Sequence, residues 1–102
     1  MYFIWGTIHV KPGAMDRYAA LMAAYAEGCR REPGCVYFDI GVSPASPDTM
    51  LLAECWDSEA AHGAHKLLDT FHENQRQLRE FATGVTLDFV ATDGAEHLDL
   101  RW

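Results

Sequence analysis

The sequence predicts an α+β domain of the ferredoxin-like type, with the element order β-α-β-β-α-β and both helical regions on one face of an antiparallel sheet. Three observations support this prediction. Four segments alternate in the manner of strands, two regions repeat apolar residues at helical spacing, and proline or glycine residues separate most of them. The 102 residues suit a single domain, with a core over about residues 2–92 and a tail over 93–102.

The first strand is expected over residues 2–10, where aromatic and β-branched side chains alternate. Gly6 lies inside it, and glycine within a strand marks either a bulge or close approach by another backbone or a ligand. A helix is expected over residues 14–31, ended by Glu32-Pro33-Gly34. Its apolar stripe consists of Tyr18, Leu21, Met22, Tyr25 and Cys29.

The second and third strands are expected over residues 35–43 and 50–56, joined as a hairpin by the turn-rich loop 44–48. In the second strand, alternation places Val36, Phe38, Ile40 and Val42 on one face. In the third, we expect Leu51 to face the helices, whereas Leu52, Glu54 and Trp56 would lie on the opposite face.

Two further helices precede the last strand. Asp57 or Ser58 should cap a short helix that runs to about residue 66, and Asp69 or Thr70 should cap a second one that runs to about residue 82. Gly84 would be its C′ residue. Asn74 and Gln75 interrupt the apolar stripe of the second helix, so they need polar partners or a cavity. The last strand is expected over 85–92, with a short extra strand around 97–100.

The sheet face away from the helices carries too much aromatic surface to be left in water. We therefore expect a homodimer in which two such faces pack together. The residues assigned to this face are Phe3, Trp5, Tyr37, Leu52, Trp56 and Val90, mixed with Thr7, His9, Asp39, Glu54 and Asp88.

Charge and cysteine content restrict the partners and the compartment. The formal net charge of −7 argues against nucleic acid and anionic membranes as main partners. The N-terminus has no basic leader or cleavage site, and no apolar stretch is long enough to span a membrane. Cys29, Cys35 and Cys55 are odd in number and lack CxxC spacing, which favours reduced thiols in the cytoplasm.

The chain resembles the antibiotic biosynthesis monooxygenase domain family over roughly residues 2–92. The resemblance lies in Glu32-Pro33-Gly34-Cys35 before the second strand, Glu54-Cys55-Trp56-Asp57 at the end of the third, Ala64-His65 on the short helix, and Phe71 on the next. The family implies a dimeric α+β barrel with a pocket between sheet and helices. Its members include cofactor-free oxygenases of phenols or quinols, haem-degrading enzymes, and isomerases of a small phosphorylated signal.

The haem-degrading branch is disfavoured by the residues at its three key positions. Those enzymes use an Asn, a Trp and an iron-ligating His, which fall here on about Gly6, His65 and Gln75. None of the three matches, and an amide is a poor haem ligand. The isomerase branch shares the Ala64-His65-Lys66 pattern, and a phosphorylated substrate would need a basic cradle such as Lys66, Arg76 and Arg79 could form.

His65 is the candidate catalytic residue, because an imidazole titrates near neutrality and can take the proton of a phenol. The resulting electron-rich anion can react with dioxygen without a metal or organic cofactor. Gly6, Phe38, Phe71 and Gln75 fit a substrate pocket on the helix side, and Trp56 lines either this pocket or the dimer seam.

No metal site is expected. His62 and His65 are adjacent on a helix, but no carboxylate has clear ligand spacing and the chain should turn before His72. Two functions therefore remain: a cofactor-independent monooxygenase acting on a small aromatic quinol or polyketide-like phenol, and a small-molecule-binding or isomerase-type dimer. A purely structural dimerisation module is a third reading.

Overall fold

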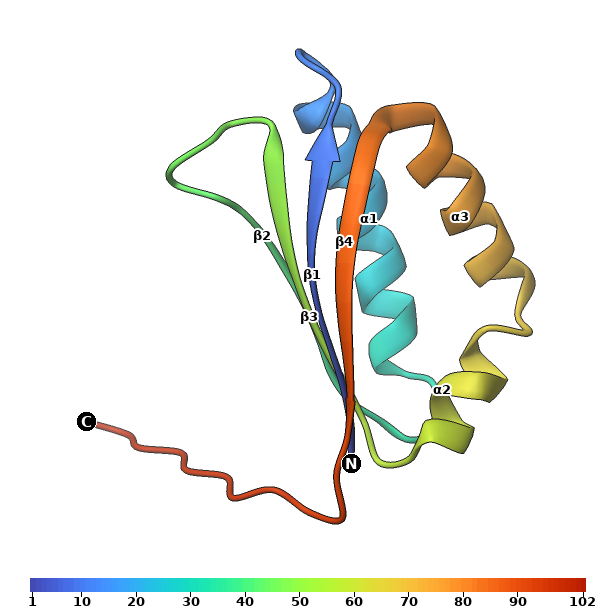
Figure 1. The fold of residues 1–102 in the computed structure, drawn as a ribbon, viewed down its shortest axis with the longest axis vertical. Coiled ribbons are helices and arrows are strands. Elements are labelled where there is room, and N and C mark those ends of the chain that lie inside the picture. The colour runs from blue at the N-terminus through green and yellow to red at the C-terminus, as the bar shows by residue number, and fades with distance from the viewer.

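The computed structural model describes residues 1–102 and contains the predicted order of elements. Its four strands form one antiparallel sheet in the order β2-β3-β1-β4. All three helices cover one face of this sheet and leave the other face bare (Figure 1). The predicted ferredoxin-like α+β fold is thus confirmed. The bounds are β1 Tyr2–Val10, α1 Met15–Arg30, β2 Cys35–Val42, β3 Thr49–Trp56, α2 Glu59–His65, α3 Asp69–Phe81 and β4 Ala82–Ala91.

The core lies between the sheet and α1, whose buried stripe includes Tyr18, Met22, Ala26 and Cys29. One apolar cluster surrounds Tyr18 and extends to Phe81 at the end of α3. A second surrounds Trp56 under α2. His62 and His65 of α2 lie against Trp56 in this second cluster. None of the helices has the length and apolar character required to cross a membrane.

The orientation of β3 differs from the prediction. Glu54 pairs with Ile4, which in turn pairs with Phe89, and directly paired residues of antiparallel strands share a face. Glu54 and Trp56 therefore face the helices and are buried, whereas Leu51 is 46% exposed on the bare face. The stretch TMLLAECW is apolar on both faces, so its alternation does not reveal which face is inside, and a one-residue error reverses every side chain.

Val36 also departs from its predicted place on the core face. The pairing of β2 with β3 shifts between Cys35 and Tyr37, and this irregularity leaves Val36 52% exposed. Cys35 packs against the core cluster around Trp56 instead.

Ser58 caps α2 as one of the two predicted candidates, because its hydroxyl oxygen accepts a hydrogen bond from the backbone N–H of Ala61 at 3.1 Å. The cap predicted for α3 is wrong, since Leu68 precedes its first turn and no side chain caps it. Gly84 is not a C′ residue either: β4 follows α3 directly, and Gly84 lies within it opposite His9. No strand forms around 97–100, and the tail extends away from the domain (Figure 1).

The turn before β2 is packed tightly against the start of α2. Gly34 has a φ of +84°, which favours glycine, and a Cβ atom there would lie 2.6 Å from Ala61 Cβ and 2.8 Å from Asp57 Oδ1. The backbone N–H of Asp57 donates to the Gly34 carbonyl at 2.8 Å. This turn sets the position of Glu32, two residues earlier.

The bare face of the sheet carries exposed apolar side chains. Phe3 and Trp5 stack with ring centroids 5.5 Å apart, and Trp5, Leu51 and Val90 are 43%, 46% and 38% exposed. The predicted aromatic character of this face is therefore present, although Leu52, Glu54 and Trp56 do not contribute to it.

Candidate functional site

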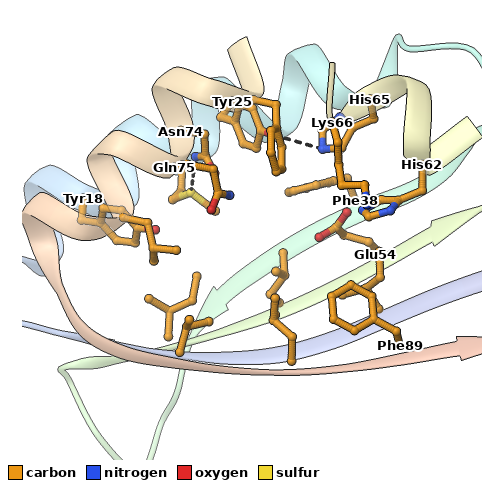
Figure 2. A pocket seen from close by; sticks show the side chains of 18 residues that line it. Tyr18, Tyr25, Phe38, Glu54, His62, His65, Lys66, Asn74, Gln75 and Phe89 are labelled. Carbon is orange, nitrogen blue, oxygen red and sulfur yellow. Dashed lines mark hydrogen bonds between the residues drawn. The ribbon is translucent and has the colours of Figure 1, made fainter. Parts of the chain in front are cut away.

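A cavity of about 270 Å³ lies between the sheet and the helices (Figure 2). Its walls are mainly apolar and are provided by strands and by α1 and α3. Polar groups gather at two places: Glu54 and residues of α2 at one end, and two amides of α3 at the other side. The apolar part of the lining consists of Ile4, Ile8, Met22, Phe38, Leu52, Phe71, Leu78, Val85, Leu87 and Phe89, together with the rings of Tyr18 and Tyr25.

His65 is held from both sides at the α2 end of the cavity. Its Nδ1 lies 2.8 Å from a carboxylate oxygen of Glu32, and its Nε2 lies 3.1 Å from the hydroxyl of Tyr25. Because a carboxylate only accepts, we assign the proton to Nδ1, and the Tyr25 hydroxyl then donates to Nε2. The unprotonated Nε2 is thus the basic atom of this histidine.

Glu54 is a buried carboxylate at the same end. One of its oxygens accepts a hydrogen bond from the indole N–H of Trp56 at 3.1 Å. The other oxygen has no hydrogen-bond partner in the protein. Every fully buried side-chain oxygen or nitrogen of the structure has such a partner, so this second oxygen is not fully buried and is accessible from the cavity. Burial raises the pKa of Glu54 to about 7, the Trp56 hydrogen bond acts in the opposite direction, and the charge of Glu32 adds to the rise.

His62 lies beside Glu54 and His65, with only 6% of its surface exposed. Burial, together with the smaller effects of the nearby His65 and Lys66, lowers the pKa of its imidazole to about 4. His62 is therefore neutral at physiological pH. Its ring lies 5.6 Å from that of His65 and 5.8 Å from that of Trp56, centroid to centroid.

Two amides of α3 face the cavity away from Glu54 (Figure 2). The NH₂ group of Asn74 donates to the sulfur of Met22 at 3.1 Å, which leaves its carbonyl oxygen as an acceptor. Gln75 has no hydrogen-bond partner within the protein and can both donate and accept. The sequence predicts that Asn74 and Gln75 need polar partners or a cavity, and both line the cavity.

The structure brings together most of the predicted site residues. His65, Phe38, Phe71 and Gln75 all line the cavity. Gly6 faces the same side but does not line it, because the side chain of Leu87 covers the place where its Cβ would be.

Trp56 lies beneath α2, with its ring 4.7 Å from that of His65, and not on the bare face where a dimer seam would form. Its contact with the site is the hydrogen bond to Glu54.

Sequence reasoning missed Glu54, Glu32 and Tyr25 as members of this site. The sequence analysis places Glu54 on the wrong face of β3, Tyr25 in the core stripe, and Glu32 at a helix end and in the motif before β2, without a role in the site. A signal was available for Glu54, since a carboxylate two residues from a tryptophan on one strand face is suited to an internal hydrogen bond. His62, which the sequence did not indicate as a site residue, is buried at the same end of the cavity.

Two groups of side chains place metal-ligand atoms within 4.8 Å of one another: Glu54 with His62 and His65, and Cys29 with Glu32 and His65. Both groups need His65, whose ring nitrogens are already hydrogen-bonded to Glu32 and Tyr25. A cation would therefore have to displace one of these partners. All three cysteines are unpaired.

Comparisons with known proteins agree with this architecture. The family model described as antibiotic biosynthesis monooxygenase matches residues 1–77. An uncharacterized protein of Synechocystis sp., sll1783, is 32% identical over 68 residues, which cover 67% of this chain and 46% of the relative. The chain thus spans about half the length of that relative.

Solved structures resemble the fold over nearly the whole chain. A candidate antibiotic biosynthesis monooxygenase of Deinococcus radiodurans superposes with a TM-score of 0.87 at 20% identity, covering 97% of this chain and 99% of that one. PA3566 of Pseudomonas aeruginosa gives a TM-score of 0.82 at 20% identity, covering 91% and 94%. A conserved protein of Methanosarcina mazei gives 0.81 at 20% identity, covering 87% and 89%. At these identities the likeness concerns the fold alone.

Proposed function

Because the chain belongs to the antibiotic biosynthesis monooxygenase family, we propose that it oxygenates a small aromatic quinol or polyketide-like phenol with dioxygen, without a metal or organic cofactor. One observation carries this proposal: an apolar cavity of about 270 Å³ has proton-accepting side chains at one end. Aromatic rings fit the apolar walls, and a hydroxyl group of the substrate would be directed toward the polar end.

His65 would take the first proton. Glu32 holds its Nδ1–H, so Nε2 is the free base once the substrate hydroxyl replaces the Tyr25 hydroxyl as its donor. Deprotonation converts the phenol into an anion that can transfer an electron to dioxygen, and recombination then forms a carbon–oxygen bond. The apolar walls keep water away from this anion.

The protein would act as a homodimer. The bare sheet face exposes Trp5, Leu51 and Val90, and pairing of two such faces would remove them from water. Its three unpaired cysteines support a reducing compartment, which we take to be the cytoplasm.

Dioxygen consumption by the purified, metal-free protein tests the activity, with anthrone and 1,4-naphthohydroquinone as substrates. We expect uptake above the spontaneous rate, and His65→Ala should lower it by about 100-fold or more. Analytical ultracentrifugation and circular dichroism would show that the variant keeps its fold. No uptake with either substrate would refute the oxygenase proposal.

A binding or isomerase-type function is the alternative. Lys66 lines the cavity and is a single cation near its polar end. Arg76, however, is exposed and bound by Glu73 and Glu80, at 2.6 and 2.9 Å. A cradle for a phosphorylated substrate would thus have to rely on Lys66, and tight binding of a phosphorylated sugar without oxygen uptake would favour this alternative.

A further inference from the structure

The proposed oxygenation needs a second proton-transfer group besides the base. When a methylene carbon of anthrone becomes a carbonyl, one atom of dioxygen stays on carbon and the other leaves as water. The peroxide formed on that carbon takes one proton back from the base. The oxygen–oxygen bond then breaks as the carbon loses its remaining hydrogen, and the departing oxygen must receive a proton. His65 alone provides one proton-exchanging atom for these events.

Glu54 occupies the position that such a second group requires. It projects from β3 into the cavity, next to His62 and His65 on α2 (Figure 2). The indole N–H of Trp56 holds one carboxyl oxygen, and the other oxygen reaches the cavity without a protein partner. The carboxyl group is thus fixed in orientation and still free to touch a ligand.

Three neighbouring groups at this end, His65, Tyr25 and His62, are less suited to the task. Both ring nitrogens of His65 are hydrogen-bonded, and the Tyr25 hydroxyl is used by His65 and has a pKa raised far above its ordinary value by burial. His62 is neutral, and its pKa is too low for it to carry a proton at physiological pH. A proton donor must hold its proton at neutral pH and release it on demand.

We propose that Glu54 is a catalytic residue of this pocket, which gives its proton to the oxygen atom that leaves as water and takes up the proton released from the substrate carbon. Glu54 is therefore protonated both before and after this step. All electrons come from the substrate carbon and pass to dioxygen, so no further oxidant or reductant is needed. This inference rests on the proposed oxygenase function.

The variant Glu54→Gln tests the inference, because glutamine keeps the size of the side chain and an oxygen for Trp56 but cannot release a proton. With anthrone as substrate, three quantities are measured: dioxygen uptake, anthraquinone formed, and total peroxide by iodide titration. We expect the rate of anthraquinone formation to fall by about 100-fold or more. Dioxygen uptake should fall less than product formation, and peroxide should accumulate.

The matched control is Glu59→Gln, an exposed carboxylate of α2 that does not line the cavity. It should keep the wild-type ratio of product to dioxygen. His65→Ala should lower uptake and product together, because it stops the first step. Anthraquinone formation by Glu54→Gln at the wild-type rate would overturn the assignment of Glu54 while leaving the oxygenase function intact. Absence of uptake by the wild type would overturn both.

A measurement on the wild type keeps the inference testable if Glu54→Gln fails to fold. Glu32, Tyr25, His62, His65 and Lys66 surround Glu54, and among these the pKa of His62 and that of Tyr25 lie far from neutrality. Since burial raises the pKa of Glu54 to about 7, the ratio of anthraquinone to dioxygen should fall as the pH rises from 6 to 8. A constant ratio over this range would refute the inference.

Discussion

Trp56 and Glu54 lie two residues apart on the same face of β3 and are joined by a hydrogen bond of 3.1 Å from the indole nitrogen to a carboxylate oxygen. Trp56 is fully buried, so this bond is shielded from water. The hydrogen bond favours the charged form of Glu54, whereas burial of this carboxyl group favours the neutral acid. The tryptophan thereby adjusts the acidity of the cavity without lining it.

Replacing Trp56 with Phe should raise the pKa of Glu54 above about 7, because the hydrogen bond that lowers it is lost. The pH at which the ratio of product to dioxygen declines should move upward by about one unit or less. The variant should also lose about 1 to 3 kcal/mol of stability, since a buried ring is made smaller. Urea unfolding and pH profiles measure the two effects, and an unshifted profile would contradict the role given to Trp56.

The Glu32→Gln variant should keep an acceptor for Nδ1–H of His65 but remove the charge that stabilises the protonated imidazole. We expect kcat to fall by about 10-fold or more with little change in KM. Stopped-flow oxygen uptake with anthrone gives both constants. Glu27→Gln, an exposed carboxylate on α1, is the control. If KM rose and kcat stayed constant, Glu32 would be a substrate-binding group instead.

Stability should respond to pH through two opposed groups. The pKa of Glu54 in the folded protein, about 7, exceeds its ordinary value of 4.5. The stabilisation of the folded state by Glu54 is therefore fully present below pH 4.5 and is lost as the pH rises through 7. The pKa of His62, about 4, lies below its ordinary value of 6.5. The stabilisation of the folded state by His62 is therefore fully present above pH 6.5 and is lost as the pH falls through 4. Each is on the order of 3 kcal/mol.

Glu54→Gln removes one of these two dependences. Urea unfolding should show the free energy of unfolding of this variant rising between pH 4 and 6.5, whereas that of the wild type stays nearly level. The free energy of unfolding of the variant, measured relative to that of the wild type, should be higher at pH 8 than at pH 4 by on the order of 3 kcal/mol. Parallel curves for the two proteins would show that Glu54 has an ordinary pKa.

Gly6→Ala should force the side chain of Leu87 to move, because the added Cβ would collide with it and would lie 3.0 Å from the Thr86 carbonyl oxygen. Leu87 lines the cavity, so the variant should bind anthrone more weakly and lose about 1 to 3 kcal/mol of stability. Gly41→Ala is a matched control, since no atom lies within 4 Å of its added Cβ. Equal anthrone affinity in both variants would contradict the expected change of the cavity.

Leu51→Glu should weaken the proposed dimer, because it places a charge on the bare sheet face where Leu51 is 46% exposed. Sedimentation velocity should shift toward the monomer at micromolar concentration. Ala20→Glu, on an exposed position of α1, should sediment as the wild type does. A wild-type protein that is already monomeric at this concentration would refute the dimer.

The fold could be predicted because its signals are local. The alternation of residues 2–10 and the breakers at Pro12 and Pro33 depend only on neighbours in the chain, and the structure places the elements within a few residues of the predicted bounds. Phe38, Phe71 and Gln75 were predicted in the same way, from their positions on a strand face or a helix stripe, and all three line the cavity. His65 was predicted from the family resemblance and from the chemistry of imidazole, and it lines the cavity too.

The hydrogen-bonded network of the site could not be predicted, because its partners are distant in sequence. His65 is 33 residues from Glu32 and 40 from Tyr25. These contacts depend on how α1 and α2 lie against the sheet. The facing of Glu54 depends on the pairing of β3 with β1, which a strand with two apolar faces does not reveal.

Gly34 touches no part of the cavity, yet its turn places Glu32 against His65 and is itself pressed against Ala61 and Asp57. A larger residue at this surface turn would rotate the acceptor away from the imidazole while every cavity side chain stayed unchanged. The proposed turnover would therefore be lost through a defect of alignment that inspection of the pocket alone would not detect.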